Sequence, residues 1–155
     1  MTWRISLIGL MLLPLMAHGE EIAPSMLTVC QHLVPAAVMR VIDGDTFVVQ
    51  ARIWEHQIWE GSVRLRHINA PETRSRCQEE REAAVKATAA LTALLPTQTV
   101  VLLCNPTADV YPGRVDATVI LRNGQTVSGL LLAQGVVRPY DWKKKRPAWC
   151  EEKGP

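Results

Sequence analysis

Apolar and polar residues alternate along the first half of the chain, a period typical of β-strands with one buried face. In the third such stretch Val63 and Leu65 alternate with Arg64 and Arg66, which predicts that the two guanidinium groups share one face. The predicted strands span residues 38–42, 46–53 and 62–67, with a hairpin connection at 54–61.

A loop broken by Pro71 is predicted at 68–76. The apolar period then becomes helical, and the helix is predicted to reach Leu95, before Pro96. Ser75 and Gln78 have capping-box spacing at its start, and acidic residues follow in the first turn. An alanine-rich stripe at helical spacing predicts close packing against a sheet; it comprises Ala83, Ala87, Ala90, Leu91 and Leu94.

Two further strands and a second helix are predicted in the remainder of the chain. They span residues 99–103, 114–122 and 127–134, with a loop at 105–113 and Gly135 ending the helix. The order is therefore three strands, helix, two strands, helix. It predicts a mainly β fold with α (α+β): a five-stranded Greek-key barrel of the OB-fold type with two to three helices.

The first 19 residues have the pattern of a secretory signal peptide. One positive charge at Arg4 precedes an apolar run over residues 5–16, and small residues stand at Ala17 and Gly19. The alternative is a membrane anchor, but twelve apolar residues fall short of the ~20 that span a bilayer. We expect a periplasmic or secreted protein without stable membrane insertion after cleavage, a lead-in at 20–35 and one domain at 36–155.

Net charge and cysteine content narrow the function classes. Residues 20–155 hold 16 of the 17 basic residues and all 15 acidic ones, so their net charge is +1 and nucleic-acid binding by bulk charge is not indicated. None of the four cysteines forms a C-x-x-C pair, which disfavours zinc, and an even number in an exported chain predicts disulfides. Three pairings remain open. The tryptophans predicted to pack against the barrel are Trp54, Trp59, Trp142 and Trp149.

Several charged residues stand where strands begin or end. The turn 43–46 (Asp-Gly-Asp-Thr) joins two strands, Arg64 lies on a strand, Glu72 on the following loop, and Arg114 at the start of another strand. Each has an ordinary structural alternative: a hairpin turn, a solvated arginine or a helix-capping carboxylate.

The combination of these motifs resembles the thermonuclease (staphylococcal-nuclease-like) family, and its bacterial exported branch in particular. The resemblance extends from about Val38 to Cys150. The matching stretches are 43–46 (DGDT), 64–73 (Arg-x4-Asn-x-Pro-Glu-Thr), 111–114 (Tyr-x-Gly-Arg), 123–135, 138–141 and 149–150. It implies an OB-fold phosphodiesterase that cleaves DNA and RNA with Ca²⁺.

The same resemblance assigns roles to individual residues. Asp45 matches a metal-ligand aspartate, with Asp43 next to the metal. Arg64 and Arg114 match two phosphate-binding arginines, since planar guanidinium groups bind phosphate oxygens in pairs. Glu72 matches the carboxylate that orients or deprotonates the attacking water.

The sequence departs from the family pattern at Asn69, where a second metal-ligand aspartate is usual. Asparagine keeps a carbonyl oxygen but loses a negative charge, so we expect weaker Ca²⁺ binding. Ala70 replaces a frequent threonine at a position that offers its backbone carbonyl. By the same resemblance Tyr111 and Tyr140 are candidates for stacking on the nucleotide, a contact that reads no sequence.

Two functions therefore compete. One is an exported Ca²⁺-dependent endonuclease acting on DNA and RNA as a monomer. The other is a catalytically weak or inactive OB module that binds nucleic acid or protein, because of Asn69. The resemblance also implies a Cys77–Cys150 disulfide, which leaves Cys30 and Cys104 to pair.

Overall fold

The computed structural model describes residues 30–150. The predicted signal peptide at 1–19 and most of the predicted lead-in lie outside the described residues. Among the residues described, no helix has the length and apolar character needed to cross a membrane.

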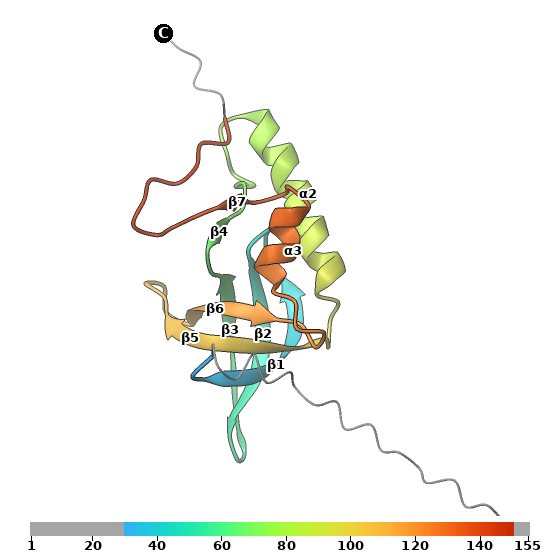
Figure 1. Ribbon diagram of the computed structural model, residues 1–155, viewed down its shortest axis with the longest axis vertical. Coiled ribbons are helices and arrows are strands. Elements are labelled where there is room, and N and C mark those ends of the chain that lie inside the picture. The colour runs from blue at the N-terminus through green and yellow to red at the C-terminus, as the bar shows by residue number, and fades with distance from the viewer. Residues whose placement is uncertain (1–29, 151–155) are drawn as a thin grey trace, which may run out of the picture.

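Five strands form a closed barrel in the order β1-β2-β3-β6-β5 (Figure 1). Neighbouring strands are antiparallel except for the parallel pair β3–β6, and β1 closes the barrel against β5. The strands are β1 (Leu33–Val41), β2 (Thr46–Trp54), β3 (Gln57–Leu65), β5 (Val100–Ala108) and β6 (Arg114–Ile120). The predicted OB-fold arrangement is thus confirmed.

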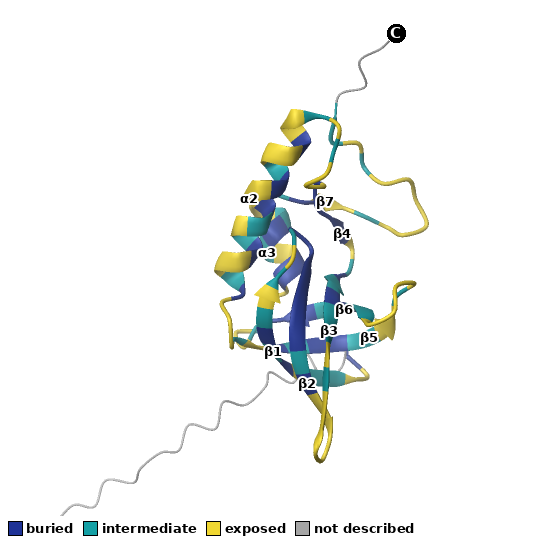
Figure 2. Ribbon diagram, turned by 180° about the vertical axis from the view of Figure 1, so that it is seen from behind, coloured by how far each residue is buried: buried dark blue, intermediate teal, exposed yellow. Residues whose placement is uncertain are grey.

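The barrel interior is apolar because inward-facing positions alternate along each strand. Its largest fully buried side chains include Phe47, Val49, Val63, Leu65 and Leu103. Figure 2 shows this buried interior, while exposed residues lie on the outer helix faces, the projecting β2–β3 hairpin, the β5–β6 loop and the C-terminal loop.

Two helices, α2 (Gln78–Leu94) and α3 (Val127–Ala133), pack beside the barrel as predicted (Figure 1). The buried stripe of α2 is centred on Ala84, Ala87 and Leu91, whereas Ala83 is only half buried. Small residues allow a close approach: a Cβ on Gly44 would lie 2.6 Å from the Cβ of Ala87 and 2.8 Å from that of Ala70. The turn that carries Asp45 therefore packs directly on the helix.

The predicted hairpin connection at 54–61 was wrong. β2 continues to Trp54 and β3 begins at Gln57, so the turn is tight and His56 adopts a φ of 64°. At this end of the hairpin most residues are exposed on both faces, so the alternation that marks a strand is missing. Trp54 is 73% exposed at the tip and Trp142 is 78% exposed, which contradicts their predicted burial.

Three other boundaries also differ from prediction. β1 begins at Leu33, inside the predicted lead-in, and β5 runs to Ala108, inside the predicted loop. Residues predicted as loop form a short strand β4 (Ile68–Asn69), which pairs with β7 (Arg138–Pro139). The predicted capping box does not form: the N-cap of α2 is Cys77, without a side-chain cap.

Two disulfides join distant parts of the chain. Cys30–Cys104 connects the residues before β1 to β5, and Cys77–Cys150 connects the start of α2 to the C-terminal segment. This is the pairing expected from the resemblance. Disulfides of this kind are typical of proteins outside the cytoplasm.

Candidate active site

Asp45 is a buried carboxylate held by the turn between β1 and β2. Its Oδ1 accepts a hydrogen bond from the Thr46 hydroxyl at 2.9 Å, and its Oδ2 accepts one from the backbone N–H of Ala70 at 3.0 Å. Asp43 caps the turn, since its Oδ1 accepts the backbone N–H of Asp45 at 3.0 Å. The Asp45 side chain is 5% exposed, and its hydrogen bonds fix its orientation.

Arg64 lies on β3 opposite Thr46 of β2, a register that brings it beside Asp45. Its Nη1 donates to Asp45 Oδ1 at 2.9 Å, and its side chain is 16% exposed. Its Nη2 is buried and has no hydrogen-bond partner among the described residues. A buried guanidinium donor without a partner is suited to an anionic ligand oxygen.

Burial raises the pKa of Asp45 above its ordinary value of 3.8, and the nearby Asp43 adds to this effect. The Arg64 guanidinium and the Ala70 N–H act in the opposite direction without cancelling it. A carboxylate under this desolvation is stabilised by an additional cation.

Asn69, on β4, lies 3% exposed beside this pair. Its Nδ2 donates to the carbonyl oxygen of Ala70 at 3.1 Å, while its Oδ1 is buried without a partner among the described residues. Asn69 Oδ1, the Asp45 carboxylate and the Ala70 backbone carbonyl are oxygen donors on residues that contact one another. Hard cations such as Ca²⁺ prefer such ligands, so the donor set fits this metal in kind.

Glu72 follows on the loop that leaves β4. Its backbone N–H donates to Oε1 of Glu80 on α2 at 3.0 Å. Its Oε1 accepts from Nη1 of Arg146 at 3.1 Å, and the side chains of Glu72 and Arg146 are 60% and 57% exposed. The carboxylate is therefore accessible to solvent.

Arg114 begins β6 and is oriented by Asp109. Its Nε and Nη2 donate to the two carboxylate oxygens of Asp109 at 2.7 and 3.1 Å, and its Cζ lies 4.3 Å from the ring centroid of Tyr111. Burial opposes the charged form of Asp109, but the hydrogen bonds from Arg114 and from the Tyr111 N–H outweigh it and lower the pKa of Asp109. Arg114 is fixed along one edge of its guanidinium group.

Asp116 lies between the two arginines. It pairs with Arg64 across the parallel β3–β6 register, and Arg114 stands two residues earlier on the same face. Burial raises the pKa of Asp116, as does the neighbouring Asp109, while Arg64, Arg66 and Arg114 act to lower it. Arg66 itself binds backbone and side-chain oxygens of β5 and β6, and this role is structural.

A pocket of about 690 Å³ opens beside Arg64 and Asp116. The C-terminal segment also lines it, with Tyr140, Trp142 and Lys143. Tyr140 therefore lines the same pocket as Arg64. Tyr111 does not line this pocket; it stacks on Arg114 instead.

The structure brings together Asp43, Asp45, Arg64, Asn69 and Ala70 through direct contacts. Glu72 lies two residues beyond Ala70, whereas Arg114 is reached across Asp116. Sequence reasoning missed four site residues: Glu80, Asp109, Asp116 and Arg146. Asp116 stands two residues after Arg114 on the same predicted strand face, whereas Glu80 and Arg146 appear in the sequence only as a first-turn helix acid and as one of four successive basic residues.

A comparison of the sequence with known proteins identifies its family. A family model described as staphylococcal nuclease homologue matches residues 62–152. A comparison with curated proteins finds no match. The matched span includes Arg64, Glu72 and Arg114, and the structure joins Asp45 to it from outside. Because the match covers more than half of the 155 residues, the chain belongs to the staphylococcal nuclease homologue family.

Proposed function

We propose that this protein is an exported, Ca²⁺-dependent phosphodiesterase that hydrolyses DNA and RNA. The observation that carries the proposal is a pair of opposite orphaned groups beside one buried ion pair. Arg64 Nη2 is a donor without a partner, and Asn69 Oδ1 is an acceptor without one, in the part of the chain that is described. A phosphodiester with a cation would satisfy both groups, because it supplies an anionic oxygen and a positive charge together.

Asp45, Asn69 and the backbone carbonyl of Ala70 are the groups that would hold Ca²⁺, with Asp43 supporting the turn. When bound, the ion supplies Lewis-acid neutralisation of one phosphate oxygen and lowers the pKa of a bound water. Because Asn69 contributes no charge, we expect its affinity for this ion to be lower than that of a site with two aspartates at these positions.

Arg64 and Arg114 bind and orient the phosphate in this proposal. Arg64 contributes the unpartnered Nη2 from the barrel wall. Arg114 keeps one edge of its guanidinium on Asp109, which aims the remaining Nη1 without requiring the side chain to reorganise. Donors fixed before the reaction stabilise negative charge that grows in the transition state.

Glu72 is the proposed general base. Its carboxylate is exposed and lies on the loop next to the buried Asp45–Arg64 pair, so it can accept a proton from a water that attacks phosphorus.

Tyr140 and Tyr111 are proposed to contact the nucleotide. Tyr140 lines the pocket next to Arg64, and Tyr111 covers the guanidinium of Arg114. Stacking on a base does not distinguish sequences, which accords with hydrolysis of both DNA and RNA.

We also propose that residues 1–19 act as a signal peptide, that 20–35 lead into a nuclease domain at 36–155, and that the protein acts as a monomer in the periplasm or outside the cell. The two disulfides support an oxidising compartment. Amino-terminal sequencing of the exported protein tests the cleavage site, and a start other than residue 20 would contradict it.

The test of the proposal is cleavage of labelled single-stranded DNA and RNA by the purified protein with both disulfides formed. We expect shortened products with millimolar Ca²⁺ and none with EDTA. The Glu72→Gln variant is the matched control, since it retains the side-chain shape and removes the proton acceptor. Equal cleavage by this variant and the wild type would exclude Glu72 as the base.

Asn69 supports a second candidate function, a module that binds nucleic acid or protein without cleaving it. Fluorescence anisotropy with the same oligonucleotides separates the two candidates. Binding that is independent of Ca²⁺, together with intact oligonucleotide after long incubation, would favour the binding module.

A further inference from the structure

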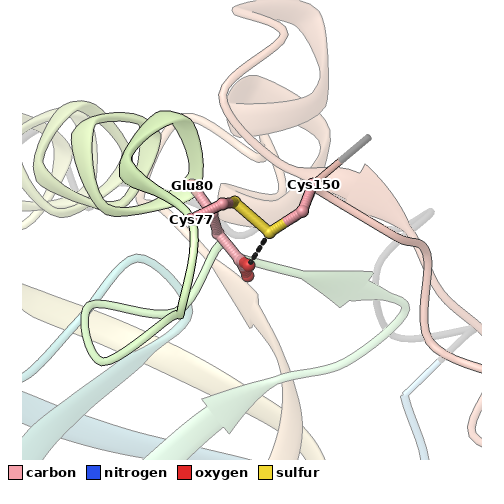
Figure 3. Close-up of side chains that lie close together, drawn as sticks. All are labelled: Cys77, Glu80 and Cys150. Carbon is pink, nitrogen blue, oxygen red and sulfur yellow. Dashed lines mark hydrogen bonds between the residues drawn. A yellow bond between two sulfur atoms is a disulfide. The ribbon is translucent and has the colours of Figure 1, made fainter. Parts of the chain in front are cut away.

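The Cys77–Cys150 disulfide lies where the loop of Glu72, the first turn of α2 and the C-terminal segment meet. Residues 140–150, here called the strap, leave β7, swing out as a wide loop and return to the start of α2 (Figure 1). Figure 3 shows Glu80 directed toward this disulfide from the helix.

Glu80 holds the backbone of the Glu72 loop. It is only 9% exposed, and its carboxylate accepts the Glu72 N–H at 3.0 Å and the Ser75 hydroxyl at 2.5 Å. Its Oε2 also lies 3.4 Å from the sulfur of Cys150. This last approach is a packing contact, because a disulfide sulfur carries no proton to donate. Cys77, Glu80 and Cys150 do not form a metal site, because both sulfurs are in the disulfide and offer no thiolate.

Arg146 of the strap holds the Glu72 side chain. Among the described residues, the Glu72 carboxylate makes no hydrogen bond or salt bridge other than this ion pair. The strap is anchored on both sides of Arg146. Before it, Tyr140 N–H bonds to the His67 carbonyl at 2.9 Å; after it, Arg138 stacks over Trp149 at 4.2 Å and bonds to the Ala148 carbonyl.

We propose that the disulfide-closed strap positions Glu72, with Arg146 acting on its side chain and Glu80 on its backbone. Glu80 and Arg146 are positioning residues: they touch Glu72 and do not touch the reacting phosphate. The inference deepens the proposed function and rests on it for its catalytic part. Without the disulfide, the strap loses its covalent anchor four residues after Arg146, and an exposed ion pair is too weak to hold it there.

The two disulfides provide a matched comparison. Cys77→Ser/Cys150→Ser opens the strap, while Cys30→Ser/Cys104→Ser removes a cross-link of nearly equal sequence separation, 74 residues against 73, away from Glu72. Hydrogen exchange of the Glu72 amide is measured in both variants under conditions where both are folded. We expect the protection of the Glu72 amide to fall about tenfold or more in the Cys77→Ser/Cys150→Ser variant only. Opening the strap there removes the disulfide that packs on Glu80 and weakens the hydrogen bond from the Glu72 N–H to the charged Glu80 carboxylate.

Activity measurements separate positioning from general stabilisation. We expect Arg146→Ala to lower kcat about tenfold with little change in KM, and Arg146→Lys to restore part of the loss. Lys145→Ala removes the same charge from the adjacent position of the strap and should leave kcat within about twofold. In a Glu72→Gln background, Arg146→Ala should have no further effect on kcat.

The outcomes are distinct. Equal losses of Glu72 amide protection in both disulfide variants would overturn the structural part of the inference. An equal kcat loss for Lys145→Ala and Arg146→Ala, or full additivity with Glu72→Gln, would overturn the role of Arg146. Failure of the proposed function would instead appear as no cleavage by the wild type, with the amide-exchange difference still present.

Discussion

The two halves of the candidate site are held in place by different means. The barrel half consists of Asp45 and Arg64, which strand register and a turn packed on α2 hold in place, together with Asn69 on the following strand β4; all three are mostly buried. The loop half consists of Glu72 and Arg146, which are more than half exposed and joined by one ion pair.

Substitutions in the two halves should therefore differ in their effect on stability. In the barrel half, a side chain that serves substrate also neutralises a buried partner, so function and stability are coupled. In the loop half, the candidate base contributes little to stability, and its position depends on a strap that is anchored far along the chain. Function and stability should therefore separate in the loop half only.

Glu72→Gln is expected to have the largest effect on activity. Loss of the proton acceptor should lower kcat by about 10²–10⁴-fold, the usual contribution of a general base. Because the side chain is 60% exposed, the free energy of unfolding should change by less than about 0.5 kcal/mol. Denaturant unfolding and initial-rate measurements check both values. A large loss of stability would contradict the separation of function from stability in the loop half.

Arg64→Gln tests the barrel half. Removal of the guanidinium should lower kcat about 10²–10³-fold and also destabilise the protein by about 1–3 kcal/mol, because the buried Asp45 loses its ion-pair partner. Urea denaturation without metal measures the second effect. Unchanged stability would mean that Asp45 does not depend on Arg64, contrary to the coupling described above.

Asn69→Asp tests the proposed Ca²⁺ site. A second carboxylate should raise Ca²⁺ affinity about tenfold. Without metal the same change should destabilise the fold, because it adds a buried negative charge beside Asp45. Calorimetric titration with Ca²⁺ and thermal unfolding with and without the ion test this reversal; an identical titration in variant and wild type would place Asn69 away from the metal.

Asp109→Asn should have the smallest effect, on acid stability. The pKa of Asp109 is lowered in the folded protein, so its contribution is present above the ordinary value of 3.8 and disappears as the pH falls through the lower folded value. The variant should therefore lose stability at neutral pH and match the wild type in strong acid. A constant difference from neutral to strongly acidic pH would contradict this linkage.

Sequence reasoning predicted the barrel half better than the loop half. The resemblance singles out Asp45 and Arg64. Strand alternation places Arg64 on a regular strand, whose register brings it beside the Asp-Gly-Asp-Thr turn that carries Asp45. Packing explains Gly44: its φ is not positive, but a Cβ there would lie 2.6 Å from that of Ala87, a contact that depends on how the helix packs.

The residues that hold Glu72 were not predictable from local pattern. Arg146 is separated from it by 74 positions, and nothing in a run of four basic residues distinguishes the one that forms the ion pair. Glu80 appears in the sequence as an ordinary first-turn helix acid, yet it is buried and binds the Glu72 loop. The Cys77–Cys150 disulfide joins the segment of Arg146 to the start of α2, whereas Glu80 reaches Glu72 across only eight positions.

The central claim is tested most directly by the initial rate of DNA cleavage as a function of Ca²⁺ concentration, measured with heat-denatured DNA for the wild type and Glu72→Gln. The account predicts a rate that rises with Ca²⁺ into the millimolar range, disappears with EDTA and is reduced at least about 100-fold in the variant. No cleavage by the wild type at millimolar Ca²⁺, with both disulfides intact, would contradict it.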